Sequence, residues 1–215
     1  SIGGILKKGT PHEVAMQQMV YTRHGVERVV RYAYETARKR DRQKKLLLVD
    51  KANAIRAQDI WTRTFAEVGE EFPDIEQDHA YVDAACMWMI KNPESFDTVV
   101  TTNLFGDIIT DLGAVLQGGM GVAASGNINP GQVSLFEPIH GSAPKYKGQN
   151  VSCPIAAIAA VYMMLHELGE ISSASKIEHA IEKVLNREDV NSVSASSGVS
   201  TDEWGDRVIE ALRQL

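Results

Sequence analysis

The stretch that decides the fold is residues 101–112, TTNLFGDIITDL, where a short apolar strand ends and a helix carrying two carboxylates begins. Asp107 and Asp111 are four residues apart, so in a helix their side chains lie on one face, one turn from each other. Carboxylates at this spacing suit an oxygen-preferring divalent cation such as Mg²⁺ or Mn²⁺. The same spacing also occurs on ordinary solvated helices, so the pair alone does not establish a metal site.

The segments before this stretch repeat the order of a strand followed by a helix. The predicted pairs are the strand at 46–49 with the helix at about 57–68, and the strand at 75–82 with the helix at 84–90. Strands that alternate with helices predict an α/β fold with parallel strands. Ligands of such sheets bind beyond the carboxyl ends of the strands, and Lys51, Asp83 and Asp107 all lie there in the sequence.

The remaining segments predict helices around one glycine-rich connection. The predictions are a turn-rich loop or extended arm at 1–13, an amphipathic helix at 13–40, a loop or hinge at 117–131, a strand at 133–136, a polar loop at 137–150, and helices at 153–169, from 172, and at about 204–215. The glycine-rich connection predicts a boundary between a central domain, 1–118, and a second domain, 119–215.

Composition limits the kind of partner. The 215 residues are 44% hydrophobic and 23% charged, as in globular proteins. A net charge of −6, from 28 acidic and 22 basic residues, leaves no basic footprint for nucleic acid. No apolar run predicts a membrane span, and Cys86 and Cys153 lack metal-ligand spacing, so a reducing, cytoplasmic setting is expected. The sequence opens on Ser1 in a glycine-rich stretch, which we interpret as an N-terminally incomplete chain.

Lys51, Asp83, Asp107 and Asp111 form the candidate constellation. Each residue also has a structural explanation: a solvated lysine at a strand end, a helix N-cap, or an acid favoured by the helix dipole. Together they match a divalent-cation site with a lysine whose proton is labile beside the metal. The loop HGSAP, 140–144, combines small residues with exposed N–H groups and either binds dinucleotide phosphates or is a structural loop.

Three segments in order, LLLVDKAN at 46–53, the run from YVDAACMW to TTNLFGDIITDL at 81–112, and SLFEPIHGSAPKYKG at 134–148, resemble the metal-dependent β-decarboxylating 2-hydroxyacid dehydrogenases. This family includes isopropylmalate, isocitrate, homoisocitrate and tartrate dehydrogenases. The resemblance covers essentially the whole chain, and the tail VSTDEWGD at 199–206 is similar to the isopropylmalate branch. It implies the two-domain α/β fold of isopropylmalate dehydrogenase, lacking its N-terminal portion.

The resemblance also implies roles for individual residues. Asp107 and Asp111 of one subunit and Asp83 of its dimer partner would hold Mg²⁺ or Mn²⁺, and the partner's Lys51 would act as base or base relay. The implied residues of the NAD or NADP site are Asn53, Glu137, His140, Gly141, Ser142, Ala143, Lys145 and Tyr146. The implied reaction oxidises a 2-hydroxy di- or tricarboxylic acid and then releases CO₂, with the metal stabilising the enolate.

Departures from the family leave several points open. The family's catalytic tyrosine and substrate arginines fall before residue 1. Lys145 and Tyr146 stand where many NAD-using members have an aspartate, and a lysine there favours a 2′-phosphate, yet the other phosphate-site residues are not apparent. 3-Isopropylmalate, in leucine biosynthesis, is the leading substrate. The alternatives are isocitrate, homoisocitrate or tartrate, a non-catalytic regulatory subunit of an isocitrate dehydrogenase, or a fragment that is inactive alone.

Overall fold

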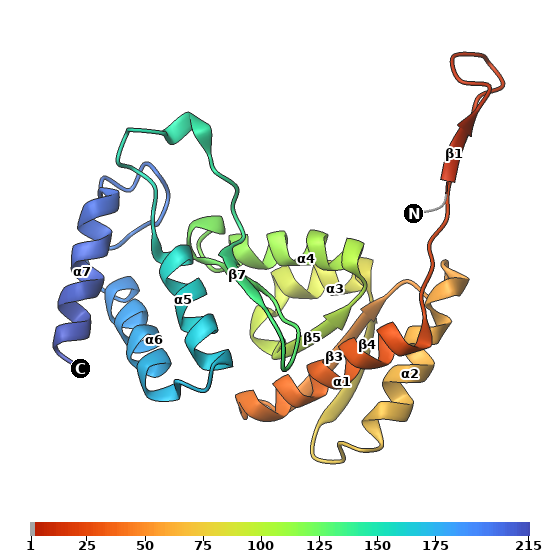
Figure 1. The fold of residues 1–215 in the computed structure, drawn as a ribbon, viewed down its shortest axis with the longest axis horizontal. Helices are drawn as coiled ribbons and strands as arrows, with labels where there is room; N and C mark the ends of the chain where they lie inside the picture. Colours follow the sequence, from red (N-terminus) through yellow and green to blue (C-terminus); the bar gives the residue numbers. More distant parts are fainter. Residues whose placement is uncertain (1–2) are drawn as a thin grey trace. The chain divides into compact units, whose positions relative to one another are not determined.

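The structure is a computed structural model that describes residues 3–215, so the first two residues of the predicted arm lie outside it. The chain forms two compact units, Ser1–Ile109 and Thr110–Leu215, and their elements are drawn in Figure 1. None of the described helices has the length and apolar character needed to cross a membrane.

A three-stranded parallel sheet organises the first unit. Its strands are β3 (Lys45–Asp50), β4 (Glu76–Tyr81) and β5 (Thr98–Thr101), in the order β4-β3-β5. The central strand β3 is buried on both faces, which is why LLLV reads as a continuous apolar run rather than an alternating one. Leu46 and Leu48 pack on one side of the sheet, and Leu47 and Val49 pack on the other.

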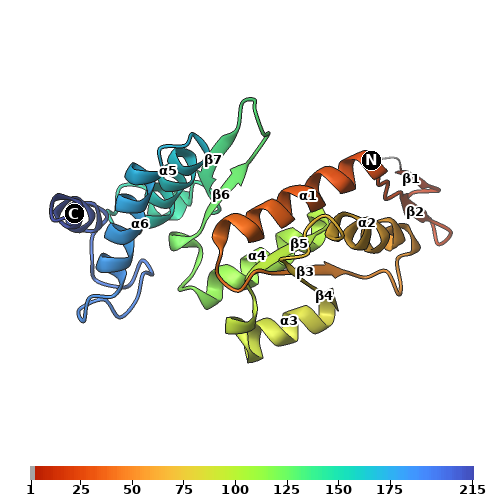
Figure 2. The same cartoon turned by 90° about the horizontal axis from the view of Figure 1, so that it is seen from below.

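Helices cover both faces of this sheet (Figure 2). They are α1 (Arg23–Arg40) and α2 (Asp59–Gly69) on one face, and α3 (Val82–Lys91) and α4 (Asn103–Leu116) on the other. Under α1 and α2, the fully buried Tyr34 ring stacks on Phe65 and Phe72, and its hydroxyl donates to the Phe65 carbonyl at 3.1 Å. Burial also raises the pKa of the Tyr34 hydroxyl.

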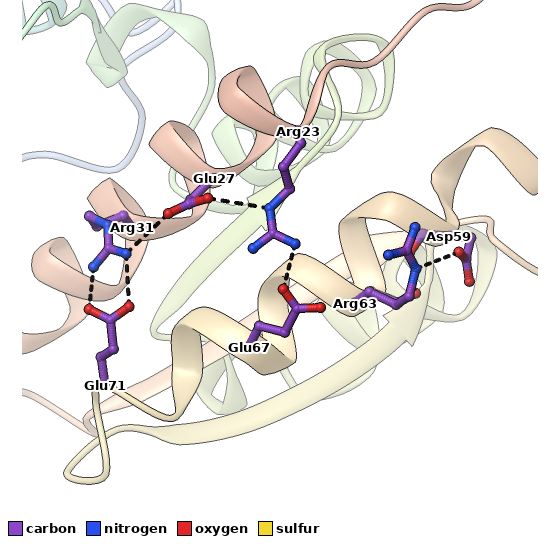
Figure 3. Close-up of polar contacts among 8 residues, drawn as sticks. Arg23, Glu27, Arg31, Asp59, Arg63, Glu67 and Glu71 are labelled. Carbon is purple, nitrogen blue, oxygen red and sulfur yellow. Dashed lines mark hydrogen bonds and ion pairs between the residues drawn. The ribbon is translucent and has the colours of Figure 1, made fainter.

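Ion pairs link the outer surface of α1 to α2 and to the turn that follows α2 (Figure 3). Arg31 binds Glu71 through two hydrogen bonds of 2.6 and 2.9 Å and also contacts Glu27. Arg23 pairs with Glu67 at 2.5 Å. Because these side chains are 35% to 56% exposed to solvent, each pair adds little to the free energy of unfolding.

The second unit begins within α4 and continues with a hairpin and three helices. The elements that follow α4 are β6 (Ala124–Asn127), β7 (Leu135–Pro138), α5 (Ile155–Glu167), α6 (Ile171–Leu185) and α7 (Thr201–Arg213). The strands pair antiparallel and contact α5, while Trp204, fully buried, packs among Ile155, Val184 and Val208. Short 3-10 turns in the chain are η1 (Arg56–Gln58), η2 (Pro93–Ser95), η3 (Met120–Val122) and η4 (Pro144–Tyr146).

The predicted parallel α/β arrangement is confirmed, with two corrections to single elements. The helix predicted from residue 13 begins only at Arg23, where Thr22 caps it by accepting the Gly25 N–H. Within the stretch assigned to that helix, β2 (Val14–Gln17) instead pairs antiparallel with β1 (Gly3–Leu6), so the extended arm is a hairpin. The predicted loop at 117–131 contains β6, in which Gly126 lies so close to the Phe136 ring that a Cβ would come within 3.1 Å. The functional division near Gly118 stays a prediction.

Candidate active site

Lys51 and Asp83 meet at the carboxyl edge of the sheet. Lys51 directly follows β3, and Asp83 lies in the first turn of α3, directly after β4. The Lys51 Nζ is 2.7 Å from the Asp83 Oδ1, and it also lies 5.6 Å from the centre of the Tyr81 ring. This hydrogen bond from Lys51 lowers the pKa of Asp83, so the carboxylate is ionised at neutral pH and chemically suited to a cation.

A tight turn carries Lys51 and Asn53. The N–H groups of Ala54 and Ile55 both donate to the Lys51 carbonyl, at 2.9 and 2.8 Å. The turn leaves Asn53 exposed and Lys51 partly buried, so both side chains are accessible to a ligand at the sheet edge.

Asp107 and Asp111 both lie on α4 and are exposed. Asn103 donates to the Asp107 carboxylate at 3.3 Å. Between the two acids in sequence, Ile109 is only 4% exposed and packs with Leu47 on the sheet. The helix therefore turns its apolar side to the sheet and its acidic side outward.

The carboxylates suit a hard cation by their chemistry, but one copy of the chain does not gather three of them. Among residues 3–215, no group of three or more His, Cys, Asp or Glu side chains is close enough to hold a metal ion. The structure thus pairs Lys51 with Asp83 and aligns Asp107 with Asp111 on one helix, without uniting the two pairs.

Apart from Asn53, the predicted dinucleotide residues lie on β7 and the loop after it, in the second unit. Glu137 on β7 is exposed, as are Gly141, Ser142 and Lys145, whereas His140, Ala143 and Tyr146 are partly buried. Ala143 adopts a left-handed conformation with φ of 43° immediately before η4. The Lys145 Nζ lies 4.6 Å from the centre of the Tyr146 ring. The loop therefore presents a cation and several small residues beside one aromatic ring.

Sequence reasoning missed three residues beneath the Lys51 turn. Asp50 and Gln58 are fully buried, and both accept hydrogen bonds from the backbone of the turn. The His79 Nε2, on the neighbouring strand β4, lies 3.0 Å from the Asp50 Oδ1. Of the three, only Asp50 could have been found from the sequence, because it is an acid at the end of an otherwise apolar strand. Gln58 and His79 reach the site only through the packing of other elements.

Comparisons with known proteins show which family this chain is similar to. The family model described as isocitrate/isopropylmalate dehydrogenase matches residues 4–208. The chain is 51% identical over 186 residues to a 3-isopropylmalate dehydrogenase of Frankia casuarinae, covering 85% of this chain and 54% of that one. It is 49% identical over 217 residues to a 3-isopropylmalate dehydrogenase of Thermobifida fusca, covering 99% of this chain and 60% of that one.

A solved structure shows the same fold. The crystal structure of isocitrate dehydrogenase from Methylococcus capsulatus matches with a TM-score of 0.88 and 37% identity, over 99% of this chain and 63% of that one. The chain thus spans between 54% and 63% of the length of these three proteins.

Proposed function

This chain belongs to the isocitrate/isopropylmalate dehydrogenase family, and on that premise we propose that the whole protein oxidises and decarboxylates 3-isopropylmalate to 2-oxo-4-methylpentanoate. One observation carries the proposal: this chain, 49% identical to a 3-isopropylmalate dehydrogenase over 99% of its own length, brings the Lys51 ammonium and the Asp83 carboxylate to within 2.7 Å of each other. A regulatory subunit without catalysis has no need of this pair or of the acidic face of α4.

The residues of the chain have distinct tasks in this proposal. Lys51, held beside Asp83, receives the proton of the substrate's 2-hydroxyl group during oxidation. Asp83, Asp107 and Asp111 hold Mg²⁺ or Mn²⁺, and their hard oxygen atoms suit either ion. When bound, the cation would draw electron density from the oxygens of the substrate, and the nicotinamide would be the oxidant.

The cofactor is NAD or NADP, held by Asn53, Glu137 and the loop 140–146. The exposed backbone of Gly141 and Ser142 can donate N–H groups to phosphate oxygens, and the Lys145 ammonium supplies positive charge for a 2′-phosphate. The presence of Lys145 favours NADP, whereas the names of the relatives do not discriminate between the two cofactors.

A homodimer completes the proposed metal site. Since three carboxylates do not gather within the described part of one chain, the Asp83 of a second copy would join Asp107 and Asp111. The outer sides of α3 and α4 carry exposed apolar side chains suited to such an interface, namely Met87, Trp88, Ile90, Leu104 and Ile108. Sedimentation of the full-length protein tests this: Ile90→Glu should yield monomers without measurable activity, and an active monomeric wild type would contradict the shared site.

Substrate and cofactor are tested together in one experiment. The full-length protein is assayed for reduction of NAD and of NADP with 3-isopropylmalate, isocitrate, homoisocitrate and tartrate in the presence of Mn²⁺. The proposal predicts the highest kcat/KM with 3-isopropylmalate. Preference for isocitrate would move the protein to another branch of the family. Absence of turnover with every substrate, together with Mn²⁺ binding unaffected by Asp107→Ala, would identify a non-catalytic subunit.

A further inference from the structure

Two buried side chains hold the backbone of the Lys51 turn. The Gln58 Oε1 accepts a hydrogen bond from the Lys51 N–H at 2.7 Å, and the Asp50 Oδ1 accepts one from the Ala52 N–H at 3.1 Å. Both acceptors belong to residues with 0% exposure. Two consecutive peptide groups at the candidate site are therefore fixed by side chains from inside the protein.

Each acceptor is itself held by a neighbour. The Gln58 side-chain amide donates to the Tyr21 hydroxyl at 3.3 Å. The Asp50 Oδ1 also contacts the His79 ring nitrogen at 3.0 Å. The turn is thus anchored to the segment before α1 through Gln58, and to strand β4 through Asp50.

This arrangement costs stability. The Asp50 Oδ2 is buried without a hydrogen-bond partner among residues 3–215, and an unpaired oxygen of a buried carboxylate is unfavourable. Buried polar groups that lower the stability of a core occur where they hold the side chains of a functional site in a fixed geometry.

We propose that Asp50 and Gln58 are positioning residues that fix the direction in which the Lys51 ammonium and the Asn53 amide are presented. The inference rests on the proposed function, in which Lys51 is the base. A tilt of roughly 10° at the Lys51 Cα moves the Nζ, about 6 Å away, by about 1 Å, and a displacement of that size costs roughly 100-fold in rate. Loss of either acceptor therefore lowers kcat more than it changes KM.

The test uses paired variants of the full-length protein. Gln58→Met keeps the length of the side chain but removes the acceptor, whereas Gln58→Glu restores it; Asp50→Ala and Asp50→Asn form the second pair. Asp59→Asn, an exposed acid at the start of α2, is the matched control. The readouts are kcat and KM for 3-isopropylmalate and the hydrogen-exchange rate of the Lys51 amide.

The expected result is a loss of about 10- to 100-fold in kcat for Gln58→Met, with KM within about threefold of wild type. The kcat of Gln58→Glu should be at least about fivefold higher than that of Gln58→Met. The Lys51 amide should exchange faster than in the wild type in Gln58→Met but not in Gln58→Glu. If Gln58→Met does not fold, Asp50→Asn should exceed Asp50→Ala in kcat by about fivefold or more.

Equal kcat in Gln58→Met and wild type, or equal losses within each pair, would overturn the positioning role. The exchange measurement needs no substrate, so an unchanged Lys51 amide rate in Gln58→Met refutes the clamp by itself. A wild-type protein that oxidises none of the four substrates overturns the proposed function instead, and the two failures are thereby distinguished.

Discussion

Replacing Ile109 with alanine tests how the acidic helix α4 is held on the sheet. Ile109 is 4% exposed and packs with Leu47, Val49 and Ala85. Removing three carbon groups from this site costs about 2.4 kcal/mol of transfer free energy, and the remaining cavity brings the expected loss to about 3 kcal/mol. The adjacent Ile108 is 53% exposed, so the matched variant Ile108→Ala should lose less than about 1 kcal/mol at low protein concentration.

Urea unfolding followed by circular dichroism measures both losses. Because Ile108 lies on the proposed dimer surface, the effect of its variant should depend on protein concentration, whereas the effect of Ile109→Ala should not. The Ile109 variant should also bind Mn²⁺ less tightly, since α4 carries two of the proposed ligands. A loss below about 1 kcal/mol for Ile109→Ala, or one equal to that of Ile108→Ala, would refute the packing account.

Three further outcomes are expected. Tyr34→Phe should lower the free energy of unfolding by about 1 kcal/mol, measured in urea, because one buried hydrogen bond is lost. Burial raises the pKa of the Cys153 thiol, so at pH 8 this thiol should be alkylated far more slowly in the folded protein than in urea, and a rate equal to that of the partly buried Cys86 would contradict its burial. The hydrogen bonds from Arg31 lower the pKa of Glu71. This carboxylate therefore stabilises the fold above its unfolded pKa of about 4.3, and the contribution is lost as the pH falls through the folded pKa. The free energy of unfolding of Glu71→Gln should accordingly fall less steeply below pH 5 than that of the wild type.

Local sequence patterns predicted the first unit well because its elements are specified locally. The run LLLV is buried on both faces of the sheet, and such a run has few alternatives to a central parallel strand. The spacing of Asp107 and Asp111 likewise required only that 103–116 be helical. Where the pattern misled, tertiary pairing decided: residues 14–17 read as the start of a helix but form a strand because residues 3–6 pair with them.

The candidate site was predictable only in part, for a related reason. Lys51 and Asp83 are recognisable as groups that follow consecutive strands, and parallel pairing of β3 with β4 then brings them together. Gln58 is different, since nothing in its sequence surroundings indicates that its amide reaches the Lys51 N–H. A contact of this kind depends on where α2 packs, and periodicity does not encode that position.

We propose that Asp83 of one subunit and the acidic face of α4 of its partner form one metal site. Its most direct test is a Mn²⁺ titration of the full-length protein, observed by electron paramagnetic resonance, with Asp83→Ala, Asp107→Ala and the control Asp59→Asn. We expect at least about a tenfold loss of affinity in both alanine variants, because each removes a charged ligand, and no change in the control. Wild-type affinity in either alanine variant would contradict the shared metal site.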